Sequence, residues 1–136
     1  MKIQSFLESA GKGACLALCY IRAVLGEKAT TTMMFDALWN ASENNIIDAN
    51  DDCYVNDAVQ LMKSVNPYKR YSVEKLKITS IEELKGQLAA VNFQNGDFNH
   101  WVLVDKGEII FDSLDDSNCV KYGVPTSARI IKMEDK

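Results

Sequence analysis

The apolar run ACLALCYIRAVLG at residues 14–26 constrains the fold more than any other segment of the chain. It is apolar on nearly every face and ends in Gly26, a pattern typical of a buried helix with a glycine C-cap. Arg22 interrupts the run, which is too short to span a bilayer. We therefore expect a helix in the interior of the protein rather than a membrane segment.

The rest of the chain shows helical patterns first and strand patterns afterwards. Helices are predicted at residues 31–39 and 56–65, and Asn66-Pro67 ends the helical part. Strands are predicted at 70–78, 90–93, 99–104, 108–112 and 128–133, with a short helix begun by the capping-box pattern of Ser80 and Glu83. This order predicts an α+β fold in which N-terminal helices pack on a C-terminal antiparallel sheet.

Length and charge limit the domain organisation and the partners. The 136 residues, 47% of them apolar, suit one globular domain spanning 1–136. The net charge is −4, and Lys and Arg are scattered among Asp and Glu, so we expect no nucleic-acid partner. The N-terminal residues show no signal-peptide pattern, which predicts a cytoplasmic protein without a membrane partner.

The four cysteines form no recognisable metal or disulfide pattern. Cys15, Cys19, Cys53 and Cys119 contain no CxxC pair, and the absence of a signal-peptide pattern favours free thiols. Cys15 and Cys19 lie one helical turn apart, but the further ligands of a zinc site are missing. We expect neither a metal ion nor another cofactor.

His100, the only histidine, opens an apolar strand pattern, and a second strand pattern ends at Asp112. A three-residue hairpin loop at 105–107, with Gly107 in the left-handed position, would pair Val104 with Glu108. Two-residue steps back along both strands then bring His100 opposite Asp112 on one face. A carboxylate in that place holds an imidazole in one tautomer and stabilises the imidazolium, so the pair needs only a nucleophile to form a hydrolase triad.

Cys15 is the candidate nucleophile because it lies in the first turn of the apolar helix. Backbone N–H groups at a helix start and a nearby imidazolium both favour a thiolate. Gly13 is expected to leave room for a substrate beside the thiol. The alternative is that Cys15 is a small core residue like its neighbour Cys19, since free cysteine is among the most buried residue types. Cys53 and Cys119 are weaker candidates.

Other polar residues are candidates for supporting roles. Asn99, Asp115 and Asp116 compete with Asp112 as the residue that orients His100. The backbone N–H of Cys15, with the side chain of Ser9 or Gln4, is a candidate oxyanion hole.

The order Cys, His, Asp, with the Cys on the first buried helix and the others on adjacent strands, resembles the papain-like cysteine peptidase superfamily. The ending NHWVLVDKGEIIFDSL is similar to the His-then-Asp hairpin of peptidase domains that trim bacteriocin leaders. The segments DDCYVNDAVQLMKSV and DSNCVKYGV are similar to an uncharacterised family of small bacterial and phage proteins. The resemblance implies a papain-like fold with a catalytic Cys15, His100 and Asp112.

The resemblance also permits a second alignment. If Leu16–Leu18 matches the Leu-Ala-Met that follows the nucleophile in the leader-trimming peptidases, the nucleophile position falls on Gly11 and the protein is inactive. Ser9 also stands where many papain-like enzymes have a glutamine.

Two hypotheses therefore follow. The first is a small cysteine peptidase or amidase acting on a peptide or protein, in which Cys15 attacks a carbonyl, His100 moves the proton and Asp112 orients His100. The second is an inactive papain-like fold, of bacterial or phage origin, that binds a peptide or protein partner.

Overall fold

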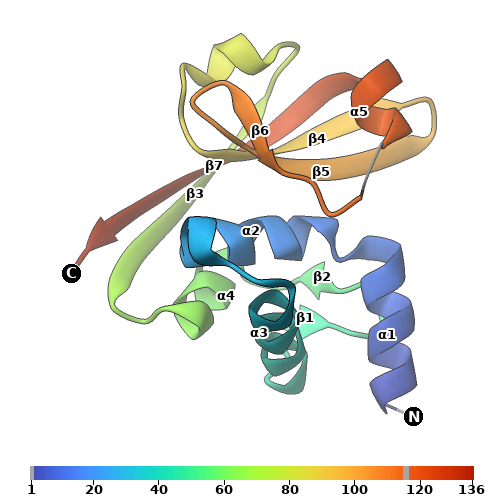
Figure 1. Ribbon diagram of the computed structural model, residues 1–136, viewed down its shortest axis with the longest axis vertical. Helices are drawn as coiled ribbons and strands as arrows, with labels where there is room; N and C mark the ends of the chain where they lie inside the picture. Colours follow the sequence, from blue (N-terminus) through green and yellow to red (C-terminus); the bar gives the residue numbers. More distant parts are fainter. Residues whose placement is uncertain (1, 115–116) are drawn as a thin grey trace.

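The computed structural model, which describes residues 2–114 and 117–136, has the predicted α+β architecture (Figure 1). The helices are α1 (Lys2–Gly13), α2 (Cys15–Leu25), α3 (Thr31–Glu43), α4 (Ala58–Val65) and α5 (Asn118–Tyr122), with 3-10 turns η1 (Gly26–Lys28) and η2 (Ile81–Leu84). The strands are β1 (Ile47–Asp48), β2 (Tyr54–Val55), β3 (Lys69–Lys77), β4 (Ala89–Asn95), β5 (Phe98–Asp105), β6 (Glu108–Phe111) and β7 (Val124–Asp135).

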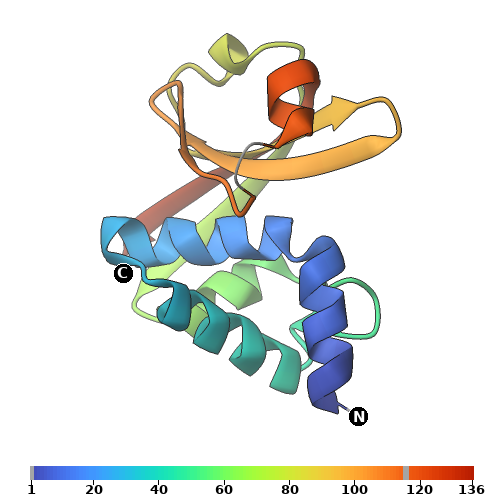
Figure 2. The same cartoon turned by 45° about the vertical axis from the view of Figure 1, so that its right-hand side comes forward.

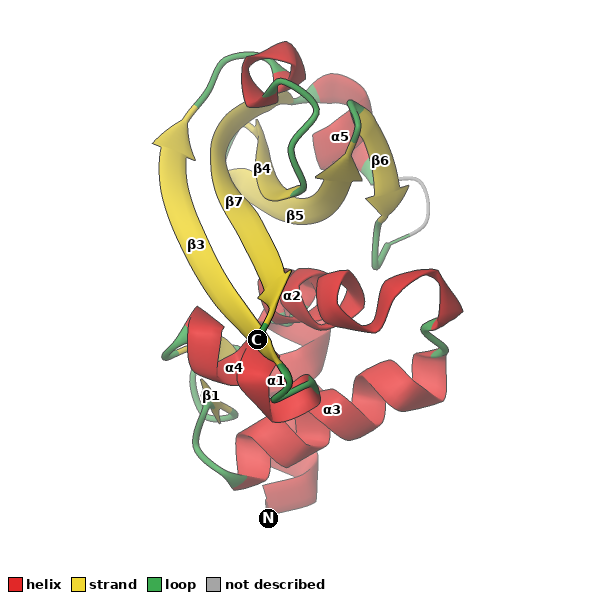
Figure 3. Ribbon diagram, turned by 90° about the vertical axis from the view of Figure 1, so that its left-hand side faces the viewer, coloured by secondary structure: helices red, strands yellow, loops and turns green. Residues whose placement is uncertain are grey.

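Five of these strands form one antiparallel sheet in the order β3-β7-β4-β5-β6. The long strands β3 and β7 extend from the sheet toward the helices (Figure 3). The helices α1 to α4 lie on one side of the sheet, with α2 running directly beneath β5 (Figures 1 and 2). The short strands β1 and β2 pair with each other in a separate ribbon.

The apolar helix predicted at residues 14–26 is α2, and it is the centre of the fold. It contacts β5, α3 and α4, and its buried residues are Ala17, Cys19, Tyr20, Ile21 and Ala23. The helix ends as predicted at Gly26, which has a φ of 75° and donates its N–H to the carbonyl of Arg22. A helix that is apolar on most faces is stable here because the sheet and two other helices cover it.

Side chains of β5 alternate between two apolar clusters. Leu103 belongs to the larger cluster between the sheet and the helices, whereas Val102 and Val104 belong to a smaller cluster on the other face. That second face contacts Leu84 of η2 and Cys119 of α5. The predicted capping box of Ser80 and Glu83 is confirmed, although the turn it begins ends at Leu84.

The hairpin between β5 and β6 differs from the prediction in loop length and register. Asp105 pairs with Glu108, so the loop is the two residues Lys106 and Gly107, with φ values of 53° and 78°. Two consecutive left-handed residues make a type I′ turn, the turn whose twist matches paired strands. The register then shifts, and Leu103 pairs with Phe111.

As a result, His100 has no partner residue in β6. This strand pairs only with residues 103–105, so residues 98–102 of β5 have an open edge on that side. The N-terminal end of α2 lies near this edge (Figure 2). Among the described residues, no helix is long and apolar enough to cross a membrane.

Candidate active site

Cys15 is the first residue of α2, and its side chain is partly buried. The preceding residue, Ala14, makes no side-chain cap for the helix. The first N–H groups of a helix have no partner within the helix, so the uncapped start of α2 leaves backbone donors around the Cys15 thiol. The predicted location of Cys15 in the first turn is therefore correct.

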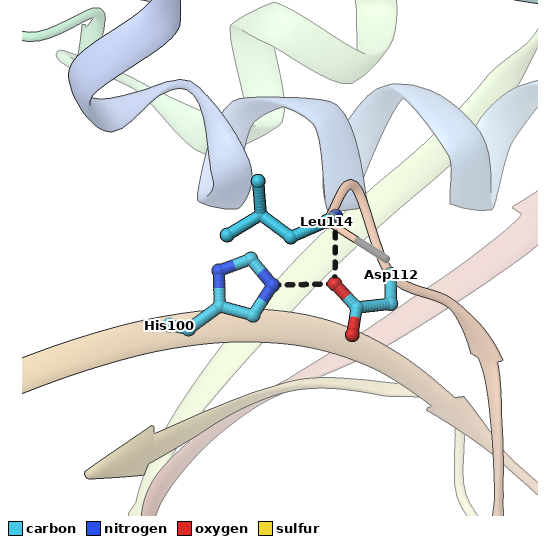
Figure 4. A network of polar contacts seen from close by, with 3 residues as sticks. All are labelled: His100, Asp112 and Leu114. Carbon is cyan, nitrogen blue, oxygen red and sulfur yellow. Dashed lines mark hydrogen bonds and ion pairs between the residues drawn. The ribbon is translucent and has the colours of Figure 1, made fainter. Parts of the chain in front are cut away.

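His100 and Asp112 are in contact, although not through strand pairing. The distance between His100 Nε2 and Asp112 Oδ1 is 2.5 Å, and His100 is 4% exposed. Asp112 lies just after the end of β6, and its Oδ1 also accepts the N–H of Leu114 at 2.9 Å (Figure 4). This second hydrogen bond holds the carboxylate in place outside the sheet, so the pair forms despite the shifted register.

The other side of the His100 ring is turned to Cys15. Figure 4 shows Nδ1 on the side of the ring away from Asp112. The imidazole is close enough to the Cys15 thiol for hydrogen bonding and charge to shift the pKa of both groups, and the backbone N–H groups of Trp101 and Leu16 also lower the pKa of the thiol. Trp101 lies on the part of β5 that β6 leaves open. Cys15, His100 and Asp112 thus form a continuous chain of contacts from helix to strand to loop.

The electrostatic environment stabilises a thiolate–imidazolium pair. Burial raises the pKa of the Cys15 thiol, but the hydrogen bond with His100, the N–H of Trp101 and the imidazolium charge together lower this pKa below its ordinary value. The pKa of His100 is raised, first by its hydrogen bond with Cys15 and, against the effect of burial, by the hydrogen bond with Asp112. The two shifts favour proton transfer from sulfur to imidazole.

The other cysteines are in different environments. Burial raises the pKa of Cys19, and the charges of Cys15 and Asp112 raise it further. Burial also raises the pKa of Cys53, whose thiol interacts with Ser9. Cys119 is partly buried in α5 and has no histidine partner, because the only histidine in the chain faces Cys15.

Two clefts meet at Cys15. A cleft of about 500 Å³ is lined by the end of α1, by α3 and by the loop after β6, and it includes His100 and Asp112. A cleft of about 630 Å³ lies on the other side, between the loop 51–56 and the sheet. Lys12, Gly13, Cys15 and Asn99 line both. A substrate that occupies both clefts must therefore pass the thiol.

The structure changes the interpretation of Gly13. A Cβ at this position would lie 2.4 Å from the carbonyl oxygen of Asp52. Gly13 therefore permits a close approach of the loop 51–53 to the end of α1: Asp52 fills the position that a Cβ would take, while Gly13 also lines both clefts.

The expected oxyanion donors also need correction. Ser9 is buried, its Oγ accepts the N–H of Cys53 at 2.5 Å, and it lines neither of the two clefts that meet at Cys15, so it holds the loop 51–53 instead. Gln4 is exposed on α1 and lines neither of the two clefts that meet at Cys15. Of the three predicted oxyanion-hole donors, only the backbone N–H of Cys15, at the start of α2, is still a candidate.

Asn99 lines both clefts together with Cys15, a position that the sequence analysis did not predict. It was considered as a residue that orients His100, but its Oδ1 accepts from Asn92 Nδ2 at 3.1 Å. Its own NH₂ group is then the end that can donate within the two clefts. The signal in the sequence was its position next to His100. Asp115 and Asp116, the other alternative candidates for orienting His100, lie outside the described residues.

Gly11, the nucleophile position in the second alignment, lines the cleft that contains His100. It lies within α1, and a Cβ there would have no atom within 4 Å. Cys15, and not position 11, is the residue in contact with His100. Within residues 2–114 and 117–136, no group of three or more His, Cys, Asp or Glu side chains could hold a metal ion.

Comparison with protein families gives one match. The profile of the family described as "Protein of unknown function, DUF261" matches residues 5–133. The chain belongs to this family. The matched part of this DUF261 protein includes Cys15, His100, Asp112 and both clefts around the thiol. No curated protein and no solved structure matches the chain.

Proposed function

We propose that the protein is a cysteine hydrolase that cleaves peptide or amide bonds, with Cys15 as the nucleophile. The observation that supports the proposal is the chain of contacts from the Cys15 thiol through the His100 ring to Asp112, at the point where two clefts meet. A nucleophile, a base and a residue that orients the base, in mutual contact, are what acyl transfer requires.

The proposed reaction begins with the thiolate of Cys15, whose proton has moved to His100. The sulfur bonds to the carbonyl carbon, and the C=O electron pair moves onto oxygen, where the N–H of Cys15 and the amide of Asn99 can donate hydrogen bonds. The C–N bond then breaks as His100 gives its proton to the leaving amine. Water loses a proton to His100 and attacks the thioester, and the C–S bond breaks to release the acid.

Asp112 acts on His100 rather than on the substrate. Its hydrogen bond to Nε2 keeps Nδ1 facing the sulfur and stabilises the imidazolium that forms during the reaction. The order Cys15, His100, Asp112, with the cysteine on a buried helix, the histidine on the C-terminal sheet and the aspartate just after its edge strand β6, resembles the arrangement in papain-like peptidases, so we extend the proposal to that superfamily.

Labelling with acyl-type probes tests the proposal. We expect peptidyl acyloxymethyl ketones, detected by intact mass and peptide mapping, to modify Cys15 and not Cys119. Labelling should be lost in Cys15→Ala, retained in the matched variant Cys119→Ala and strongly slowed in His100→Ala. Cys15→Ser should abolish turnover of peptide substrates with little change in melting temperature.

The same experiment identifies the alternative. If no probe labels Cys15 and Cys15→Ser lowers the melting temperature, the thiol is a packing residue and the hydrolase proposal is wrong. The clefts would then belong to a peptide-binding module without catalysis.

A further inference from the structure

The cleft between the loop 51–56 and the sheet contains two cations on neighbouring strands. Lys75 of β3 is directly opposite Arg129 of β7 in the antiparallel register, and both line this cleft. Like charges directly opposite each other on a sheet are destabilising. The pair is therefore a feature that the packing of the sheet does not explain.

Arg129 has a defined position within the cleft. Its guanidinium carbon lies 5.1 Å from the centre of the Trp101 ring, which belongs to β5. Arg129 pairs with Ala90 of β4, whereas Trp101 pairs with Asn92 of the same strand, so the guanidinium reaches the indole diagonally across β4. Stacking on Trp101 uses one face of the guanidinium and leaves its N–H groups available.

These two cations have no anionic partner among the residues that the structure describes, since neither forms an ion pair with a carboxylate there. Asp51 and Asp52 lie on the loop side of the cleft and are exposed. Tyr20, which also lines the cleft, is buried close enough to Arg129 for the two to interact electrostatically. Burial raises the pKa of this tyrosine to about 12, so its hydroxyl stays protonated as a further donor.

We propose that Lys75 and Arg129 bind a carboxylate of the substrate, and that this carboxylate belongs to an Asp or Glu side chain in the acyl portion of an acidic peptide. The proposal rests on the proposed hydrolase function. Two cations beside a neutral hydroxyl donor are the groups that recognise a carboxylate by charge-assisted hydrogen bonds.

The carboxylate is assigned to the acyl portion of the substrate because of where His100, the general acid, lies. His100 must give its proton to the leaving nitrogen, and it lines the other cleft, not the one with Arg129. The leaving amine therefore lies on the His100 side, among Met34, Phe35 and Leu114. The acyl portion lies on the side of Lys75 and Arg129. The C-terminal carboxylate of a peptide lies beyond the scissile bond, on the leaving-group side, so a carboxylate in the acyl portion must come from a side chain.

Matched peptidyl acyloxymethyl ketones test this assignment. Probes of sequence Ala-Ala-Ala are compared with versions that carry Glu or its neutral isostere Gln at each position, and the rate of Cys15 modification is measured. At one position, Glu should react about 10-fold faster than Gln at low salt, and the advantage should shrink as NaCl is added. Lys75→Gln and Arg129→Gln should remove the advantage.

Lys77→Gln is the control, because Lys77 is exposed two residues along the same strand and does not line the cleft. This variant removes the same charge and should retain the preference for Glu. Equal rates for Glu and Gln at every position, with Cys15 still reactive, would overturn the carboxylate site and leave the hydrolase proposal intact.

A second measurement does not depend on catalysis. In a Trp39→Phe, Cys15→Ala protein, the fluorescence of Trp101 reports on the cleft during titration with acetyl-Ala-Glu-Ala-amide or its Gln counterpart. Binding of the Glu peptide that is lost in Arg129→Gln supports the site even if Cys15 never reacts, in which case the hydrolase proposal alone fails. Indistinguishable titrations with both peptides would contradict the site.

Discussion

Replacing Gly13 by alanine tests the close contact that holds the cleft beside Cys15. The new Cβ would lie 2.4 Å from the carbonyl oxygen of Asp52 and 2.6 Å from its Cβ. Ordinary contacts begin at about 3.4 Å, so the loop must move by about 1 Å or the helix end must shift. Gly13 itself does not have a positive φ, so the cost comes from the contact and not from the backbone.

Gly11→Ala provides the matched control. Gly11 lies in the same helix, is exposed, and has nothing within 4 Å of an added Cβ. Alanine should therefore stabilise the protein there by about 0.5–1 kcal/mol through helix propensity. At Gly13, overpacking should cost about 1–3 kcal/mol. The free energy of unfolding of Gly13→Ala should therefore be lower than that of Gly11→Ala by more than the overpacking cost alone.

Urea unfolding followed by circular dichroism measures both free energies under the same conditions. We expect Gly11→Ala to unfold at higher urea than the wild type and Gly13→Ala to unfold at lower urea, with similar slopes. If both substitutions changed stability equally, Gly13 would not lie in close contact with Asp52 in solution.

Three further predictions concern the proposed site. Asp112→Asn should lower kcat/KM for a peptide substrate by about 10–10⁴-fold, because the neutral amide stabilises the imidazolium less; unchanged kinetics would contradict the orienting role. Asn99→Ala should lower kcat by about 10²–10³-fold and leave alkylation by iodoacetamide nearly unchanged, since that reaction forms no oxyanion; an equal loss in both assays would indicate a structural role. Because Asp112 contributes to the raised pKa of His100, Asp112→Asn should also move the basic limb of the pH–rate profile to lower pH, and an unmoved limb would argue against this coupling.

The sequence predicted the elements whose signals are local. The all-round apolar pattern of residues 14–26 identified α2 and its burial, and the alternation of strand patterns identified the antiparallel sheet. Contact between His100 and Asp112 was also predicted, but for a reason that proved wrong. The loop has two residues because Lys106 adopts a left-handed conformation, which is uncommon for a side chain of this type and not evident from the sequence.

The features that sequence analysis missed depend on contacts between distant segments. The role of Gly13 depends on its close approach to Asp52, and the hydrogen bond of Ser9 depends on the position of the Cys53 N–H. Lys75 and Arg129 become neighbours only through the register of β3 with β7. None of these has a local pattern, because each is set by tertiary packing.

The rate of alkylation of Cys15 by iodoacetamide as a function of pH tests the central claim most directly. Peptide mapping reports Cys15 and Cys119 in the same molecule, so the partly buried Cys119 serves as the internal reference. We predict that the rate at Cys15 rises with a midpoint below the ordinary thiol pKa of about 8.5, and that His100→Ala moves this midpoint to higher pH. A midpoint at Cys15 equal to or above that of Cys119, and unchanged by His100→Ala, would contradict the activation of Cys15 by His100.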